Sequence, residues 1–540
     1  MDRLKLHDYE ALSPFQIKDE LIKLASDEAR KSNSAFLNAG RGNPNWIATR
    51  PREAFFALGQ FAITEAKRVM DHPAGLGGMP AIKGCHDRFL RWAEANADMP
   101  GTDTLLTVVK HAIFAFDFDA DAFVHELTDS IIGDNYPVPD RILHHNEIIA
   151  HEYLMWAMCA GRRPETRFDL FAVEGGTAAM CYIFKSLKAN RLLNAGDTIA
   201  LSTPIFTPYL EMPELEDYSL ESVHVETDEE DGFQLTDAAV ETLKDPKVKA
   251  FFLVNPGNPS SVALNKASLE KLADVVENHR PDLIVLTDDV YGTFVHDFTS
   301  VMGYMPSNTI GVYSYSKYFG CTGWRLGVIA VAQDNIFDLK LAEHSEEIKQ
   351  TLDKRYGTLS LTPRDIRFVD RLVADSRDVA LNHTAGLSLP QQVMMTLFSL
   401  VELVDTKKDY QTACMELVHR RFKLLTEAMG IEVNAGENYD AYYGIIDFEY
   451  WLRKYVGDDV VAWIKKNVHP LDIAFKLAED HGIVLLNGSG FDAPGWSARV
   501  SFANLPDEAY AQIGRAVRSV ARGYVEAYRA ANAMPLHGGS

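Results

Sequence analysis

Residues 314–327 place a single lysine among hydroxyl groups and glycines. Lys317 follows Ser314 and Ser316, and Arg325 comes eight residues after the lysine. Strand-like apolar runs on both sides predict that this segment connects two buried strands. The lysine amine could form a Schiff base with a cofactor aldehyde, and the hydroxyls and the guanidinium are candidates for binding or orienting its phosphate. The alternative is a surface lysine on a loop, which is the commoner situation for a lone lysine.

Other polar groups follow apolar runs further upstream. Asp288 comes directly after the apolar residues 283–287, with Tyr291 three residues on, and Asn258 lies in the loop after residues 250–254. In α/β proteins the carboxyl ends of neighbouring strands face the crevice in which ligands bind. We therefore expect these three side chains to share one crevice with the lysine segment.

Two local patterns resemble the pyridoxal 5'-phosphate (PLP) segments of the aspartate aminotransferase superfamily. Residues 314–327 read Ser-x-Ser-Lys-x-x-Gly-x-x-Gly-x-Arg-x-Gly, which is similar to the family segment that carries the cofactor lysine. Residues 255–260 read Asn-Pro-Gly-Asn-Pro-Ser and are similar to the family loop Asn-Pro-x-x-Asn-Pro-Thr-Gly, except that Ser260 and Ser261 replace its Thr-Gly. The resemblance implies that the cofactor is PLP.

The resemblance also implies a role for each of these residues. Lys317 would carry the cofactor and then act as the general base, and Asp288 would hold the pyridine nitrogen protonated. Asn258 and Tyr291 would share the phenolic oxygen of the cofactor. The residues expected to contact the cofactor are Tyr136, Gly175, Gly176, Thr177, Phe206, Asn258, Asp288, Tyr291, Ser314, Ser316, Lys317 and Arg325.

Some of these contacts rest on weaker signals. Gly175, Gly176 and Thr177 form a glycine turn between a strand-like run and a helical one, and such a turn offers free backbone N–H groups to a phosphate. An aromatic residue at the position of Phe206 stacks on the pyridine ring in the family, and a core phenylalanine is the alternative. Tyr136 would reach the phosphate of the neighbouring subunit, or it packs beside a proline turn.

Arg499 is expected to bind the substrate. It lies in the strand-like run 498–502, where an unpaired arginine is costly to bury, and the resemblance implies that it clamps the substrate α-carboxylate in bidentate fashion. Asn258 is expected to contribute to the same site. Arg41 and Thr384 lie in loops that we expect to close the pocket beside the β-carboxylate. The alternatives are a surface salt bridge for Arg41 and a helix N-cap for Thr384.

The whole chain resembles the aspartate 4-decarboxylases (aspartate β-decarboxylases) within this superfamily. The resemblance rests on the length of the chain, the long segment before residue 135, the insertion after residue 335, and the local sequences at 40–46 and 382–388. It implies conversion of L-aspartate to L-alanine and carbon dioxide through a ketimine intermediate, a minor aminotransferase activity, and dimers with shared active sites that build a larger assembly such as a dodecamer. The alternatives are an ordinary aspartate or aromatic amino acid aminotransferase, and a non-catalytic PLP-binding or regulatory protein.

The composition of the chain limits the possible binding partners and the cellular compartment. The chain has 540 residues and a formal net charge of -23, which argues against a nucleic-acid partner. Its five cysteines are scattered without CxxC spacing, which favours a reducing compartment and no metal site. The N-terminus lacks an apolar signal core, and no run of about 18 apolar residues indicates a membrane segment. We therefore expect a cytoplasmic enzyme that binds L-aspartate and other small dicarboxylic amino acids.

The alternation of strands and helices from residue 168 and the resemblance together predict an α/β protein of PLP-dependent transferase fold type I. We expect a large domain with a mostly parallel seven-stranded sheet between helices, and a smaller α+β domain from the N- and C-terminal segments. The expected divisions are 1–60 for an N-terminal arm and part of the small domain, 61–395 for the large PLP-binding domain with a helical insertion at about 335–380, and 396–540 for the C-terminal small domain. A helix is expected at 15–29, and another should follow the loop 382–392 and continue to about residue 430.

Overall fold

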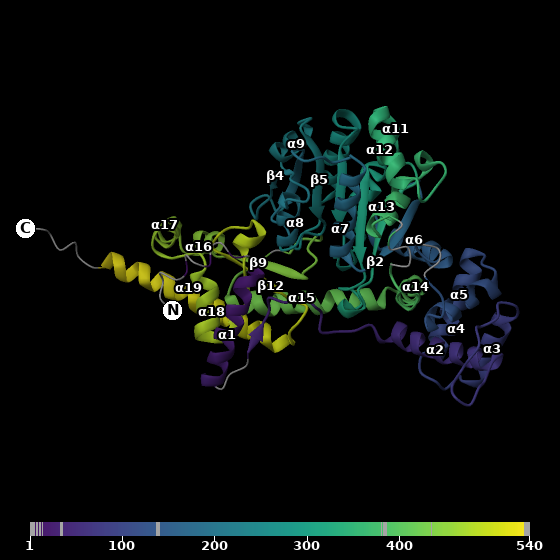
Figure 1. Cartoon of the computed structure of the whole chain (residues 1–540). Coiled ribbons are helices and arrows are strands. Elements are labelled where there is room, and N and C mark those ends of the chain that lie inside the picture. The colour runs from purple at the N-terminus through teal and green to yellow at the C-terminus, as the bar shows by residue number, and fades with distance from the viewer. Residues whose placement is uncertain are drawn as a thin grey trace, which may run out of the picture.

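The computed structural model describes residues 6, 9, 12, 14–32, 36–136, 141–379, 381, 386–433 and 435–533. Figure 1 shows a sheet flanked by helices, a second unit beside it that contains α1 (Pro14–Ser32) and α19 (Asp507–Ala533), and a group of helices on the other side. In the ranges that the structure describes, no helix is long and apolar enough to cross a membrane.

The large sheet has seven strands in the order β2-β8-β7-β6-β5-β3-β4. The strands are β2 (Phe168–Val173), β3 (Thr198–Thr203), β4 (Glu221–Glu226), β5 (Val248–Val254), β6 (Ile284–Asp288), β7 (Thr309–Ser314) and β8 (Gly327–Ala332). Only β8 runs against the others, because it pairs antiparallel with both β7 and β2. The mostly parallel seven-stranded sheet predicted from the sequence is therefore confirmed.

Helices cover both faces of this sheet, and its central strands are accordingly almost continuously apolar. The helices of this unit are α6 (His144–Met158), α7 (Gly176–Ala189), α8 (Thr207–Glu211), α9 (Asp237–Lys244), α10 (Lys266–Asp274), α11 (Ile336–Glu343), α12 (Glu346–Tyr356) and α13 (Phe368–Ser376). On one face α7, α11 and α13 share a core with alternate strand residues, and on the other face α9 and α10 do so. The helical pattern expected at about 335–380 is thus confirmed by α11, α12 and α13.

The second unit combines the two ends of the chain. Its strands are β1 (Leu37–Asn38), β9 (Tyr443–Asp447), β10 (Ile483–Val484), β11 (Leu486–Asn487) and β12 (Ser497–Ser501), and its helices are α1 (Pro14–Ser32), α16 (Phe448–Tyr455), α17 (Asp458–Asn467), α18 (Asp472–His481) and α19 (Asp507–Ala533). Strands β11, β12 and β9 form an antiparallel sheet, and β1 pairs with β10. The predicted N-terminal helix is α1, which packs on α18. A smaller α+β unit from both termini is thus confirmed, whereas the division points at 60 and 395 stay predictions.

Two helices connect the units where the sequence predicted one. Helix α14 (Leu389–Val404) ends before α15 (Asp409–Met429) begins, so the expectation of one helix to about residue 430 is wrong. The Asp405 carboxylate accepts a hydrogen bond from the backbone N–H of Tyr410 at 3.1 Å, and Lys408 has a left-handed φ of 55°. A short acidic side chain that bonds to nearby backbone competes with helical hydrogen bonds, which explains the break.

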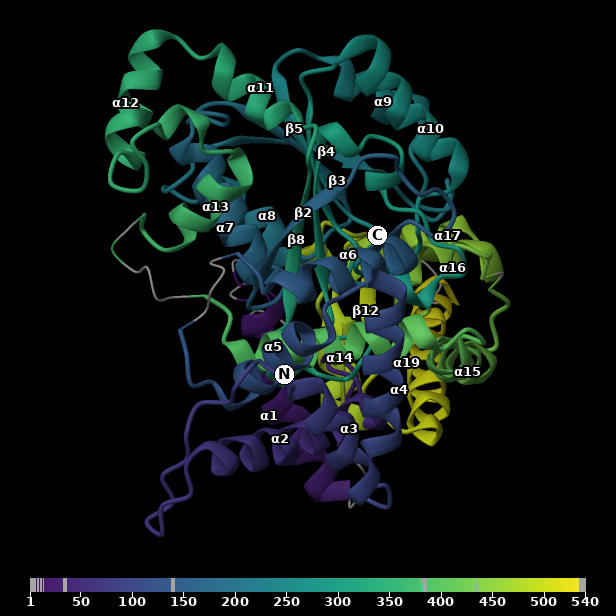
Figure 2. The same ribbon diagram turned by 90° about the vertical axis from the view of Figure 1, so that its right-hand side faces the viewer.

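The long segment before residue 135 forms a helical layer below the sheet (Figure 2). Its helices are α2 (Thr49–Val69), α3 (Cys85–Ala95), α4 (Thr102–Phe116) and α5 (Ala120–Ile132), and they share one core with α14. Gly101 lets α4 begin against α2, because a Cβ there would lie 2.2 Å from the Glu53 carbonyl carbon. Helix α2 ends at Val69, before the glycine-rich residues 75–80.

Candidate active site

The predicted cofactor lysine lies on the connection between β7 and β8. Lys317 Nζ donates a hydrogen bond to the Gly42 carbonyl oxygen at 3.1 Å. The loop around residue 42 packs closely on the lysine segment, since a Cβ on Gly320 would lie 1.8 Å from the Trp46 carbonyl oxygen, and Trp46 Nε1 donates to the Tyr318 carbonyl at 3.1 Å. The loop thus covers the lysine, as expected for the lip of an active site.

A buried carboxylate lies at the end of β6. Asp288 accepts a hydrogen bond from the Tyr209 hydroxyl at 2.7 Å and another from the Val290 N–H at 3.2 Å. Burial raises the pKa of Asp288 to about 6, although these two hydrogen bonds and the charge of Lys317 act to lower it. A carboxylate held out of water in this way is suited to pair with a cationic nitrogen. Tyr209 was not predicted from the sequence as a partner of Asp288.

Donors for an anion converge near the start of α7. Gly175 has a φ of 92°, and a Cβ on it would lie 2.9 Å from a guanidinium nitrogen of Arg325. A Cβ on Gly176 would have both the Asp288 carboxylate and Ser314 within 4.0 Å, and the Ser314 hydroxyl donates to the Ser316 hydroxyl at 3.0 Å. A helix N-terminus, two hydroxyls and an arginine are the groups that bind phosphate.

Arg499 on β12 is buried without a carboxylate partner among the described residues. Its Nη1 donates to the Asn258 side-chain oxygen at 2.9 Å and its Nη2 to the Gly40 carbonyl at 3.0 Å. The guanidinium also lies 4.3 Å from the ring centre of Tyr443 and 4.6 Å from that of Phe491. Burial lowers the pKa of Arg499. A buried cation with neutral partners is suited to bind an anionic substrate group.

Tyr443 on β9 belongs to the same group, and the sequence analysis missed it. Its hydroxyl accepts a hydrogen bond from the Tyr291 hydroxyl at 3.2 Å, and a Cβ on Gly42 would lie 2.0 Å from it. Burial acts to raise the pKa of Tyr443, but the charges of Lys317 and Arg499 and the hydrogen bond from Tyr291 together lower that pKa. Tyr443 therefore connects the part of the site around Lys317 with the part around Arg499.

The family model described as aminotransferase class I and II matches residues 172–517. The chain belongs to this family. A relative from Pseudomonas sp, the bifunctional aspartate aminotransferase and L-aspartate beta-decarboxylase, is 47% identical over 96% of this chain and 97% of its own. The resemblance to the aspartate 4-decarboxylases stated from the sequence is thereby confirmed.

Solved aminotransferases of this family have the same fold. A Thermus thermophilus aspartate aminotransferase tetra mutant complexed with tryptophan matches with a TM-score of 0.58 at 17% identity, over 97% of this chain and 99% of that chain. The aspartate aminotransferase from Rhizobium meliloti matches with a TM-score of 0.58 at 14% identity, over 95% of this chain and 97% of that chain. These similarities confirm fold type I.

The residues of the site fit the PLP of the aminotransferase class I and II family. The glycine turn at 175–176 leaves room that any side chain would fill, and it faces Arg325 and the serine hydroxyls. Asp288 ends β6 and Lys317 follows the end of the parallel neighbour β7, so both lie at the same edge of the sheet. An amine, a phosphate cradle and a buried carboxylate are the three partners that a pyridine aldehyde phosphate requires.

Four other predicted site residues have fewer contacts with the cofactor and substrate residues described above, and a fifth is not described. Phe206 lies where β3 leads into α8, with its ring 5.3 Å from that of Tyr209, and Thr177 is exposed in the first turn of α7. Tyr136 is 73% exposed. Arg41 is exposed between two residues whose carbonyls bind Arg499 and Lys317. Thr384 lies outside the described residues.

Proposed function

We propose that this protein converts L-aspartate to L-alanine and carbon dioxide with PLP as cofactor, and that it has a minor aspartate aminotransferase activity. The observation that carries the proposal is the similarity, over nearly the full length of both chains, to a relative named for these two activities. The buried Arg499 and the neighbouring Asn258 support a substrate with an α-carboxylate.

The chain's own groups account for the binding of the cofactor and the substrate. We assign the phosphate to the start of α7 with Ser314, Ser316 and Arg325, the pyridine nitrogen to Asp288, and the aldehyde to Lys317. The bound cofactor supplies an electron sink for negative charge that develops on the amino acid.

Within that site Arg499 holds the substrate α-carboxylate with both guanidinium nitrogens of its fork. Lys317 takes the proton from the substrate Cα as general base. The bond from Cβ to the side-chain carboxylate then breaks, its electron pair stays with the amino acid, carbon dioxide leaves, and Cβ gains a proton. Lys317 finally returns a proton to Cα, which gives L-alanine. Tyr443 and Tyr291 keep the wall between Lys317 and Arg499 polar, with the Tyr291 hydroxyl donating to that of Tyr443.

Removal of the Arg499 side chain should weaken L-aspartate binding by about 2–5 kcal/mol, the usual cost of unpairing a buried charge pair. Lysine at this position should not restore binding fully, because it lacks the planar fork that also bonds to Asn258. The measurement is KM for L-aspartate together with the absorbance of bound PLP. We expect a raised KM with normal cofactor absorbance. An Arg499→Lys enzyme with unchanged KM would remove Arg499 from the substrate site.

Arg41 is proposed to set the ratio between decarboxylation and amino-group transfer. The backbone carbonyls of its two neighbours accept hydrogen bonds from Lys317 and Arg499, so the backbone of Arg41 lies beside the pocket, and its side chain is exposed. We propose that Arg41 and Thr384 orient the β-carboxylate and limit water entry, which favours loss of carbon dioxide.

Arg41→Ala and Thr384→Ala should each lower the amount of alanine formed per enzyme molecule that is converted to the aminated cofactor form. Arg50→Ala is a matched control, because Arg50 is also exposed but lies at the start of α2. Ratios equal to wild type in both variants, with the control unchanged, would show that other residues set this partition.

An ordinary aspartate or aromatic aminotransferase is the second candidate, favoured by the fold neighbours. It would require a 2-oxo acid as amino acceptor. A non-catalytic protein would not require the partly buried Lys317 and the buried Arg499 at one site. Incubation of purified enzyme with L-aspartate, with and without added 2-oxo acid, tests the proposal: alanine must form in both cases.

We also propose a dimer with shared active sites, in which the exposed Tyr136 reaches the phosphate bound by the neighbouring subunit. Such dimers would build a larger assembly such as a dodecamer, in the cytoplasm. The exposed position of Tyr136 supports a role toward a partner subunit, since an exposed tyrosine is available to an intermolecular contact.

A further inference from the structure

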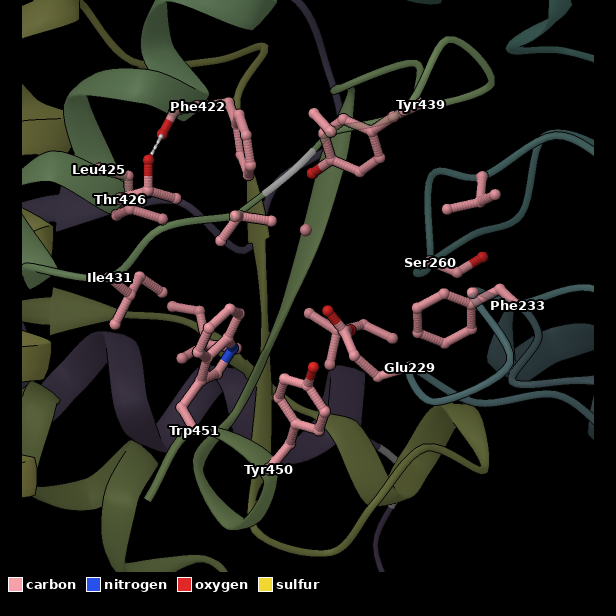
Figure 3. A pocket seen from close by; sticks show the side chains of 18 of the residues that line it. Glu229, Phe233, Ser260, Phe422, Leu425, Thr426, Ile431, Tyr439, Tyr450 and Trp451 are labelled. Carbon is pink, nitrogen blue, oxygen red and sulfur yellow. Dashed lines mark hydrogen bonds between the residues drawn. The ribbon is translucent and has the colours of Figure 1, made fainter. Parts of the chain in front are cut away.

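A second cavity lies behind the strands that bind the substrate. It has a volume of about 470 Å³ and is bounded by residues 229–234 and 260–265 of the large unit, and by α15, β9, α16 and β12 (Figure 3). Successive side chains of a strand point to opposite faces. Thus Arg499 faces the active site and Val500 lines the cavity, while Tyr443 faces the active site and Gly444 lines the cavity.

The glycine at position 444 keeps the wall of this cavity open. A Cβ on Gly444 would lie 3.0 Å from the Phe502 ring and 3.3 Å from the Tyr439 hydroxyl. A side chain there would therefore fill part of the space or displace its walls. The resulting volume is in the range of pockets that bind small organic molecules, about 300–1,000 Å³.

The walls are apolar and aromatic, with one carboxylate among the rings. Figure 3 shows Glu229 between Phe233 and Tyr450, with Trp451 across the cavity. Among the described residues, Glu229 has no hydrogen bond or ion pair with its carboxylate. Burial, together with the nearby charge of Asp447, raises the pKa of Glu229 to about 7, although the charge of Lys454 acts to lower it. An unpaired carboxylate beside aromatic faces is suited to an organic cation.

The one cation among the described lining residues does not neutralise this carboxylate. The Lys454 ammonium lies 4.9 Å from the ring centre of Trp451 and 5.6 Å from that of Tyr450. The rings thus already attract a positive charge at the rim. Glu229 and Glu432 leave the lining with an excess of negative charge over Lys454.

The cavity shares structural elements with the active site. The Tyr439 hydroxyl in the cavity wall donates to the backbone carbonyl of Tyr443 at 2.8 Å. Ser260 lines the cavity two residues after Asn258, which accepts from Arg499. A ligand in the cavity would therefore contact two segments that also position the substrate arginine.

We propose that this cavity binds a small organic cation with an apolar body, and that its occupancy changes the affinity for L-aspartate. The carboxylate of Glu229 would pair with the cation and the aromatic walls would cover its apolar part. Because coupling between two sites is reciprocal, L-aspartate would change the affinity for the cation by the same factor.

Calorimetric titration of the PLP-loaded enzyme with benzyltrimethylammonium tests the binding site. This cation has no N–H and cannot react with the cofactor aldehyde. We expect one cation per chain, and weakening by about tenfold or more in Glu229→Gln. Glu230→Gln is the matched control, because Glu230 is exposed on the same loop outside the cavity lining, and it should bind as wild type does.

Further measurements locate the bound cation and test the coupling between the cavity and the L-aspartate site. Ala435→Trp should block binding by filling the cavity from its rim, and benzyl alcohol, which lacks the charge, should bind more weakly. Equal affinity in Glu229→Gln and wild type would overturn the proposal, as would competitive displacement by succinate, which would place the cation in the active site. An unchanged KM for L-aspartate at saturating cation would overturn the coupling. Binding is measured without turnover, so its failure is separate from failure of the decarboxylase proposal.

Discussion

Replacement of Lys317 by alanine should reduce turnover of L-aspartate by about 10³-fold or more, because one side chain supplies both the covalent partner of the cofactor and the general base. Lys317 lies in the segment between β7 and β8 and donates a hydrogen bond to the Gly42 carbonyl in the site. We expect no neighbouring group among the described residues to take over both tasks, and added PLP should not restore the rate.

Borohydride reduction of the PLP-loaded enzyme followed by peptide mapping checks the assignment. The cofactor should be fixed to the peptide that contains Lys317, and the Lys317→Ala enzyme should give no such peptide. Lys340→Ala is a suitable control, because Lys340 lies in α11 on the outer layer of the sheet. A label fixed to any other lysine would contradict the central role of Lys317.

Replacement of Asp288 by asparagine should lower kcat by about 10²–10³-fold, the effect typical of removing one preorganised electrostatic partner. The amide keeps the size of the side chain and the neighbouring Tyr209, but it cannot hold a protonated pyridine nitrogen. The adjacent Asp289 is a control: its carboxylate bonds to Thr287 and Ser300 and is buried. Asp289→Asn should lower stability while the cofactor absorbance remains normal.

The buried carboxylate of Asp288 should make the affinity for PLP depend on pH. Burial raises the pKa of Asp288 to about 6 in the cofactor-free protein, above the ordinary value of 3.8. Below pH 6 the carboxyl is increasingly protonated and must lose its proton to pair with the pyridinium, so PLP affinity should fall as pH falls through 6. Titrations with PLP between pH 5 and 8 should show this dependence in wild type and its absence in Asp288→Asn. An equal dependence in both would assign the titration to another group.

Much of the fold and part of the site could be predicted because the signals are local. Apolar runs lead to Asn258, Asp288 and the Lys317 segment, and they indicate strands whose carboxyl ends face one crevice. The structure has β5, β6 and β7 at these three positions. Arg499 could be identified because a charged residue inside a short apolar strand requires a specific partner.

Other parts depend on contacts that sequence spacing does not reveal. Tyr209 meets Asp288 across 79 residues of chain, and the hydroxyls of Tyr291 and Tyr443 meet across 152. No local pattern distinguishes Tyr443 from other tyrosines that begin a strand. The break between α14 and α15 was missed because the apolar periodicity continues on both sides, while a single side chain, Asp405, bonds to the backbone in between.

The most direct measurement uses L-aspartate radiolabelled at C4 or at C1, given to the purified PLP-loaded enzyme without any 2-oxo acid. A decarboxylase that acts on the side chain releases the C4 label as carbon dioxide and retains the C1 label in alanine, with one alanine for each carbon dioxide. The account predicts this outcome for wild type and its loss in Lys317→Ala. Retention of both labels in oxaloacetate, with turnover only when a 2-oxo acid is added, would contradict it.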